Sequence, residues 1–115
     1  MITEDYVSFE IAKLLKEKGF DDFTCHSYFY TNGDIEEETR YEGDFGRPTL
    51  QMAMKWLREE KDLYVMPQIL SDGTYIGYIY RTDGFGLIGH DKRRVRNNPE
   101  EACESAIRYC LEELI

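Results

Sequence analysis

Apolar residues recur at helical spacing in several parts of the chain, and the most regular repeat begins just after Pro48. Its members stand at positions i, i+3, i+4 and i+7, which places them on one face of a helix: Leu50, Ala53, Met54 and Leu57. Thr49 is a suitable N-cap for this helix, and the polar run REEKD ends it. An apolar, β-prone segment from Leu63 to Leu70 follows directly. The sequence therefore predicts a helix joined to a strand.

Two further helices are predicted at the ends of the chain. Thr3 is the expected N-cap of a helix over residues 3–18, because acidic residues follow it in the first turn and an apolar stripe comes after them. Near the other end, Asn98 is a good N-cap, Pro99 suits the first helical position and Glu101 completes a capping box. Apolar positions then continue at helical spacing to the end of the chain.

The remaining regular segments have strand patterns. Residues 24–31 are rich in β-forming residues and predict a first strand. Asp72-Gly73 predicts a tight hairpin, from which residues 74–81 return as a strand. Pro67 cannot donate to a ladder, so its strand is expected at an edge or at a bulge. A short further strand is expected around residues 85–88.

These elements predict an α+β fold, with three helices packed on a small, mainly antiparallel sheet in the order α-β-(long loop)-α-β-β-α. A length of 115 residues suits a single domain over residues 1–115. We interpret residues 32–47 as the long, acidic and mobile loop, which could include one irregular strand. Asn32-Gly33 could equally open a hairpin whose return strand uses Ile35, Thr39 and Tyr41.

The charge balance limits the partners that the protein can bind. The formal net charge of −9 repels nucleic-acid phosphates and anionic lipid, so direct nucleic-acid binding is disfavoured. The acidic N-terminus lacks the pattern of a signal peptide, and no segment reaches membrane-spanning length, so we expect a cytoplasmic protein without a membrane partner. Three cysteines without C-x-x-C spacing indicate reduced, mostly buried thiols.

Aromatic residues supply the main candidate for function. The predicted strands carry more tyrosines than one small core can hide, and tyrosine suits contact surfaces. We therefore interpret the chain as a non-enzymatic interaction module that binds a protein partner or itself through its tyrosine-rich sheet or an edge strand. The candidate interaction residues are Tyr28, Tyr30, Tyr64, Tyr75, Tyr78, Tyr80 and, on the second face of the middle helix, Trp56.

A basic cluster offers a second candidate contact. Lys92, Arg93, Arg94 and Arg96 are the only dense positive charge in an acidic chain. They could contact a phosphate or an acidic partner. The favoured interpretation is that they balance the chain's own acidic residues, such as Glu100 and Glu101.

Catalytic and cofactor motifs are weak. Gly84, Gly86 and Gly89 spell G-x-G-x-x-G, but no helix is predicted to open within the motif, so the glycines are interpreted as turn and bulge residues. His26 and His90 lack a second ligand at metal spacing. Cys103 and Cys110 lie two helical turns apart, too far to share an ion. We predict no cofactor and no metal, and a small enzyme using His26 or His90 is the least favoured hypothesis.

Three blocks carry a resemblance: ITEDYVSFEIAKLLKEKGFD, PTLQMAMKWLREEKDL and EEACESAIRYCLEELI. Together they resemble a family of small uncharacterised proteins from gut anaerobic bacteria and their phages or mobile elements, for which no activity is known. The resemblance implies an accessory role. The alternative function is therefore an acidic factor that inhibits or modulates a nucleic-acid enzyme by presenting the carboxylates of residues 34–44.

Overall fold

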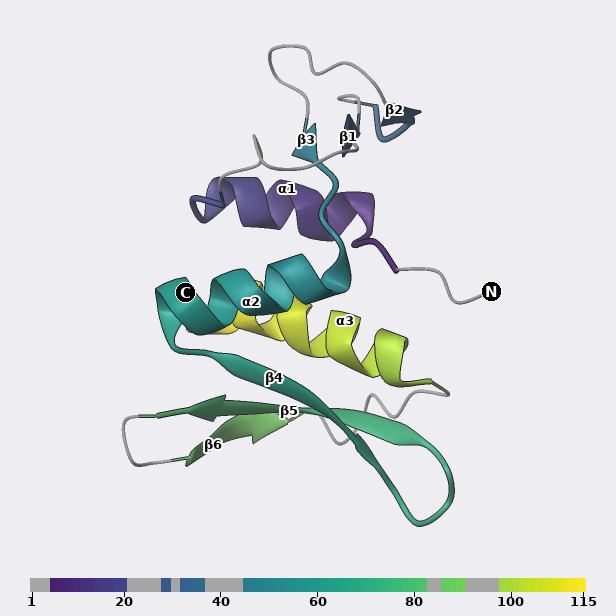
Figure 1. Ribbon diagram of the computed structural model, residues 1–115, viewed down its shortest axis with the longest axis vertical. Coiled ribbons are helices and arrows are strands. Elements are labelled where there is room, and N and C mark those ends of the chain that lie inside the picture. Colours follow the sequence, from purple (N-terminus) through teal and green to yellow (C-terminus); the bar gives the residue numbers. More distant parts are fainter. Residues whose placement is uncertain (1–4, 21–27, 30–31, 37–44, 83–85, 91–97) are drawn as a thin grey trace. The chain divides into compact units, whose positions relative to one another are not determined.

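The computed structural model describes residues 5–20, 28–29, 32–36, 45–82, 86–90 and 98–115 (Figure 1). Its helices are α1 (Phe9–Glu17), α2 (Leu50–Lys61) and α3 (Pro99–Tyr109), and α3 continues into a π-helical turn (Cys110–Leu114). Its strands are β1 (Tyr28–Phe29), β2 (Ile35–Glu36), β3 (Phe45–Gly46), β4 (Tyr64–Ile69), β5 (Tyr75–Arg81) and β6 (Gly86–His90). The predicted α+β class is confirmed.

The chain divides into two compact units, Met1–Ala53 and Met54–Ile115, with the boundary inside α2. The strands also divide, into one antiparallel sheet of order β2-β1-β3 and another of order β4-β5-β6. The sequence predicts one sheet, whereas the structure has two, because β1 pairs with β2 and β3 in the first unit. The single domain over residues 1–115 stays a prediction. Among the described residues, no helix has the length and apolar character needed to cross a membrane.

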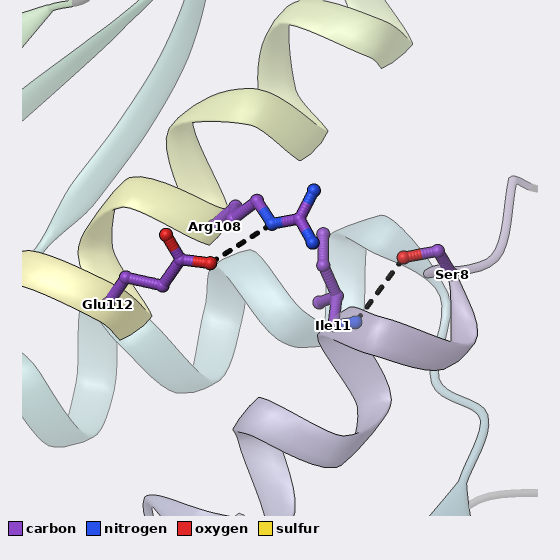
Figure 2. A network of polar contacts seen from close by, with 4 residues as sticks. All are labelled: Ser8, Ile11, Arg108 and Glu112. Atoms are coloured by element: carbon purple, nitrogen blue, oxygen red, sulfur yellow. Dashed lines mark hydrogen bonds and ion pairs between the residues drawn. The ribbon is translucent and has the colours of Figure 1, made fainter.

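In the first unit, α1 begins later than the sequence predicts. Its N-cap is Ser8, whose side-chain oxygen accepts a hydrogen bond from the Ile11 amide at 3.3 Å (Figure 2). The preceding residues are held in another conformation, because Tyr6 forms a β-bridge with Thr49 and the Val7 amide donates to the Pro48 carbonyl at 3.0 Å. The prediction that residues 5–8 are helical is therefore wrong. Pairing with a distant segment outweighs the local capping signal there.

Asn32-Gly33 opens a hairpin, the alternative that the sequence left open. Phe29 pairs with Ile35 on one side of β1 and with Phe45 on the other. With only two residues in each strand, the ladder is short, and aromatic packing holds the sheet on α1. The Phe9 ring of α1 lies 5.4 Å from the Phe29 ring and 5.5 Å from the Phe45 ring, between centroids.

The predicted cap and apolar face of α2 are confirmed. The Met52 amide donates to the Thr49 hydroxyl oxygen at 3.1 Å. Along the apolar face Leu50, Ala53 and Leu57 are buried, whereas Met54 is half-buried. The helix ends at Lys61, and the next residue, Asp62, has a positive φ of 54°. The Asp62 carboxylate accepts hydrogen bonds from the Thr82 amide at 3.2 Å and the Thr82 hydroxyl at 2.7 Å, which ties this helix end to the end of β5.

In the second unit, the β4–β5 hairpin closes at Asp72-Gly73 as predicted. The Gly73 amide donates to the Leu70 carbonyl at 3.0 Å, and Gly73 has a φ of 87°, so this loop uses glycine in the left-handed region. The Thr74 amide and hydroxyl both donate to the Asp72 carboxylate. These hydrogen bonds lower the pKa of the exposed Asp72 carboxyl, because they stabilise its ionised form.

Pro67 determines which β4 groups face outward. It pairs with Gly77, and because proline has no N–H, the two form a non-hydrogen-bonded pair. The Leu70 amide, three residues further on, donates across the hairpin to the Thr74 carbonyl at 2.7 Å, as this alternation requires. The main-chain groups of Val65, Pro67 and Ile69 therefore face away from β5. The prediction of an edge or bulge position is confirmed, because β4 is an edge strand.

Gly77 is where β5 and α3 approach each other most closely. A Cβ atom at Gly77 would lie 2.6 Å from the Ala102 carbonyl oxygen and 2.7 Å from the Ala106 Cβ. Glycine on the strand and alanines one turn apart on the helix let the two backbones come this near. As Figure 1 shows, α3 consequently lies along one face of the β4-β5-β6 sheet. The predicted capping of α3 is confirmed, since Asn98 accepts from the Glu101 amide at 2.8 Å.

The register predicts how β4 tolerates proline at two neighbouring exposed positions. Gln68→Pro removes an amide that donates to β5 and should lower the free energy of unfolding by about 3 kcal/mol. Ile69→Pro removes an outward-facing amide and should cost less than about 1 kcal/mol. Urea denaturation of the two variants makes the comparison, and equal losses would contradict the assigned register.

The close approach at Gly77 predicts a large effect of a single methyl group. Gly77→Ala should lower the free energy of unfolding by about 3 kcal/mol, because the new Cβ meets the backbone of α3. Gly73→Ala is the matched control. Its added Cβ meets no atom within 4 Å, so only left-handed backbone strain acts there, costing about 1 kcal/mol. A loss at Gly77 no larger than at Gly73, measured by urea denaturation, would refute the close contact.

Candidate functional site

The β4–β5 hairpin is built from the longest run of the chain with almost no charge. Between Asp62 and Arg81 the only charged residue is Asp72, at the hairpin turn, although charged residues make up 32% of the whole chain. Depletion of charge distinguishes the centres of protein interfaces from the rest of a protein surface. The hairpin therefore shares this depletion of charge with the centres of protein interfaces.

The pairing register sorts the hairpin tyrosines by face. Because Gly77 faces α3 and side chains alternate along a strand, Tyr75 lies on the α3 side, and Tyr78 and Tyr80 lie on the opposite side. Across the ladder, Tyr64 pairs with Tyr80. The structure thus brings Tyr64, Tyr78 and Tyr80 together on the sheet face that α3 does not cover.

This tyrosine-bearing face is partly covered. The Tyr78 and Tyr80 rings stack with 6.2 Å between centroids and 27° between planes, and both side chains are half-buried. Ile76, on the same face, is only 2% exposed. Met66, which pairs with Tyr78, is 55% exposed. On β4, the exposed side chains of this face are those of Met66 and Gln68.

The outer half of β4 is the most exposed apolar stretch of the hairpin. All four residues of Met66–Ile69, named here the exposed β4 segment, are exposed. Ile69 is 56% exposed and lies on the opposite face from Met66. The segment therefore offers one large apolar side chain on each face of the sheet edge.

Pro67 limits how this segment can bind. A partner strand that added to the edge would find the Pro67 carbonyl but no amide at the centre of the segment. Proline at such a position protects an edge strand from further pairing. Contacts with a partner must therefore come mainly from side chains.

The other predicted interaction residues lie apart from this segment. Tyr28 is half-buried in β1, in the first unit. Trp56 is half-buried on α2, with the Lys61 ammonium nitrogen 5.6 Å from the centroid of its ring. Tyr30 lies outside the described residues, as do all four members of the basic cluster: Lys92, Arg93, Arg94 and Arg96. Their predicted roles stay predictions.

Sequence reasoning missed Met66 and Ile69. The sequence predicts an edge strand as a possible contact, but it singles out the tyrosines and Trp56 rather than these two side chains. Two signals point to them: a charge-free run and a proline that places their strand at an edge. Together these signals would have indicated apolar side chains at a sheet border.

Candidate chemical sites receive little support from the described residues. Gly86 and Gly89 lie in β6, where the ladder with β5 has an irregularity near Gly89, so no helix opens at these two glycines. His26 and residues 37–44 lie outside the described residues, and only the backbone of His90 is described. In the part of the chain that the structure describes, no cluster of three or more His, Cys, Asp or Glu residues could hold a metal ion.

Cys103 and Cys110 are buried thiols of α3 and of the turn that follows it. Burial raises the pKa of Cys103 to about 11, with a smaller contribution from Glu100. Burial also raises the pKa of Cys110 to about 12, against a small opposing effect of Arg81. Both thiols therefore stay protonated near neutral pH, where a nucleophile or a metal ligand would need the thiolate.

Comparisons with known proteins do not assign the chain to a family. No family model, no curated protein and no solved structure matches it. The expected relationship to small proteins of gut anaerobes and their phages stays a prediction. Function must accordingly be argued from the surface of the molecule itself.

The buried thiols predict a loss of stability at alkaline pH. Above the ordinary thiol pKa of 9.0, the unfolded chain loses protons that the folded chain retains at Cys103 and Cys110. The unfolded state then binds fewer protons, so the free energy of unfolding falls as the pH rises toward 11 to 12. Urea denaturation of wild type and of the Cys103→Ala/Cys110→Ala variant, from pH 7 upward, should give a shallower decline for the variant. Parallel declines would contradict this account, because tyrosine and lysine titration is common to both proteins.

Proposed function

We propose that the protein is a non-enzymatic interaction module that binds a protein partner through the exposed β4 segment. The observation that carries the proposal is that Met66 and Ile69 are each more than half exposed on an almost uncharged hairpin. Single apolar side chains on a surface are common, but a charge-free strand that presents one on each face is a more specific feature.

Burying the two apolar side chains supplies only part of the free energy that binding needs, because association itself costs about 4 kcal/mol or more. Covering the exposed half of Met66 and of Ile69 would contribute roughly 1 kcal/mol per side chain. The neighbouring tyrosines Tyr64 and Tyr78, both half-buried, add polar tips that can hydrogen-bond at the border of a contact. Pro67 suppresses unselective strand pairing, which favours recognition by side chains.

The rigidity of the hairpin supports the same proposal. The Asp72 carboxylate holds the turn through Thr74, and the Asp62 carboxylate holds the far end of β5 through Thr82. Between these points, α3 packs on the sheet at Gly77. Because β4 is paired with β5, these contacts hold the exposed β4 segment in place as well. The segment therefore loses little conformational entropy on binding.

A charge-insertion experiment tests the proposal. Met66→Glu/Ile69→Glu should abolish capture of a protein partner from a lysate of the source cells, because binding would then bury unpaired carboxylates. Gln51→Glu/Tyr109→Glu adds the same charge at two exposed positions outside β4 and should retain the partner. Thermal denaturation first establishes that both variants fold, and titration calorimetry with the purified partner then measures affinity.

Self-association is examined with the same variants by sedimentation velocity over a wide range of concentration. A dimer that is lost only in the Met66→Glu/Ile69→Glu variant would make a second copy the partner. The proposal fails if wild type is monomeric throughout and captures nothing, or if the β4 variant binds the partner as well as wild type does.

A further inference from the structure

The turn between β1 and β2 holds the Asn32 side chain by two hydrogen bonds to Asp34. Asn32 is exposed and precedes Gly33. Its side-chain oxygen accepts a hydrogen bond from the Asp34 amide at 3.0 Å, and its side-chain nitrogen donates to the Asp34 carboxylate at 3.2 Å. Gly33 has a φ of 94° and no side chain to obstruct its own amide nitrogen.

We propose that Asn32 is a site of spontaneous modification, at which the chain converts asparagine to aspartate and isoaspartate through attack by the Gly33 amide nitrogen. The reaction needs water as its only co-reactant and involves no oxidation or reduction. It lies outside the proposed binding function, because Asn32 belongs to the first unit and the exposed β4 segment to the second.

The atoms balance in two steps. First, the Gly33 nitrogen forms a bond to the side-chain carbonyl carbon of Asn32, the bond from that carbon to the amide nitrogen breaks, and ammonia leaves with the former Gly33 amide proton. A five-membered imide ring remains. Water then adds to one of the two ring carbonyls, the ring C–N bond at that carbonyl breaks, and the nitrogen regains a proton. Opening on one side gives aspartate, and opening on the other gives isoaspartate.

The Asp34 amide is the group that makes the native turn favourable for this attack. In the tetrahedral intermediate, negative charge develops on the Asn32 side-chain oxygen, which already accepts the Asp34 N–H. A backbone donor aimed at a developing oxyanion stabilises it, as in acyl-transfer enzymes. Folding therefore holds one element of transition-state stabilisation in place at this asparagine.

Asp72-Gly73 provides an internal comparison. In that turn too, a side-chain oxygen, that of Asp72, accepts a hydrogen bond from the amide two residues later, that of Thr74. Gly73, like Gly33, has a positive φ. The Asp72 side chain is a carboxylate rather than a carboxamide, and the Thr74 hydrogen bonds that lower its pKa favour the ionised form, which is a poor electrophile. The same chain thus contains one turn primed for imide formation and one protected from it.

Modification would disturb the first unit. Aspartate at position 32 would face the Asp34 carboxylate where the asparagine nitrogen now donates, so attraction becomes repulsion. Isoaspartate lengthens the main chain by one carbon between β1 and β2. The longer connection would disturb the pairing of Phe29 with Ile35. The Phe9 ring lies close to this turn, since a Cβ at Gly33 would be 3.0 Å from one of its ring carbons.

Peptide mapping of the aged protein tests the proposal. Native chain is incubated at mildly alkaline pH beside chain unfolded in urea, and the tryptic peptide over residues 19–40, which contains no other Asn or Gln, is analysed for its mass gain and for isoaspartate. We expect native Asn32 to react at least as fast as unfolded Asn32, and Asp72 to yield no isoaspartate in the native chain. Slower reaction in the native chain would overturn the proposal.

Two variants at position 34 isolate the amide donor. Asp34→Pro removes the N–H and should slow the native reaction about tenfold, whereas Asp34→Ala keeps the N–H and should not. Thermal denaturation establishes that both variants fold, and their rates in urea give the baseline for each sequence. If Asp34→Pro reacts as fast as Asp34→Ala in the native state, the proposed role of the amide is wrong.

Discussion

The second unit depends on one close contact between a strand and a helix, at Gly77. Ala102 and Ala106 can lie against this glycine because none of the three residues has a side chain beyond Cβ. The contact turns the Gly77 side of β5 toward α3, and strand alternation then turns Tyr78 and Tyr80 to the other side. The arrangement of the whole hairpin follows from which face this glycine occupies.

Pro67 acts on the same hairpin from the other strand. It pairs with Gly77, so the residue that permits helix packing and the residue that blocks edge pairing lie side by side. The outer half of β4 can therefore expose Met66 and Ile69 with less risk of forming a continuous sheet with other molecules. A side-chain contact surface at a protected edge is consistent with an interaction module.

The first unit is organised by side chains more than by its ladder. Phe9 contacts the rings of β1 and β3, and the Lys13 ammonium nitrogen lies 4.8 Å from the centroid of the Phe9 ring. The Arg47 guanidinium lies 4.0 Å from the centroid of the Tyr6 ring. Tilted and edge-to-face ring contacts, with cations over the ring faces, stabilise the described part of this sheet.

Local sequence alone determined the class of the fold and most helix ends. Thr49 and Asn98 cap their helices as predicted, and Asp72-Gly73 and Pro67 give the hairpin and its edge position, because capping, turns and missing donors act within a few residues. Tertiary structure decided what depends on distant partners. Pairing of Tyr6 with Thr49 moved the start of α1, and β1 found partners on both sides and so formed a separate sheet. The exposure of Met66 and Ile69 likewise follows only from where α3 packs, because burial depends on residues far along the chain.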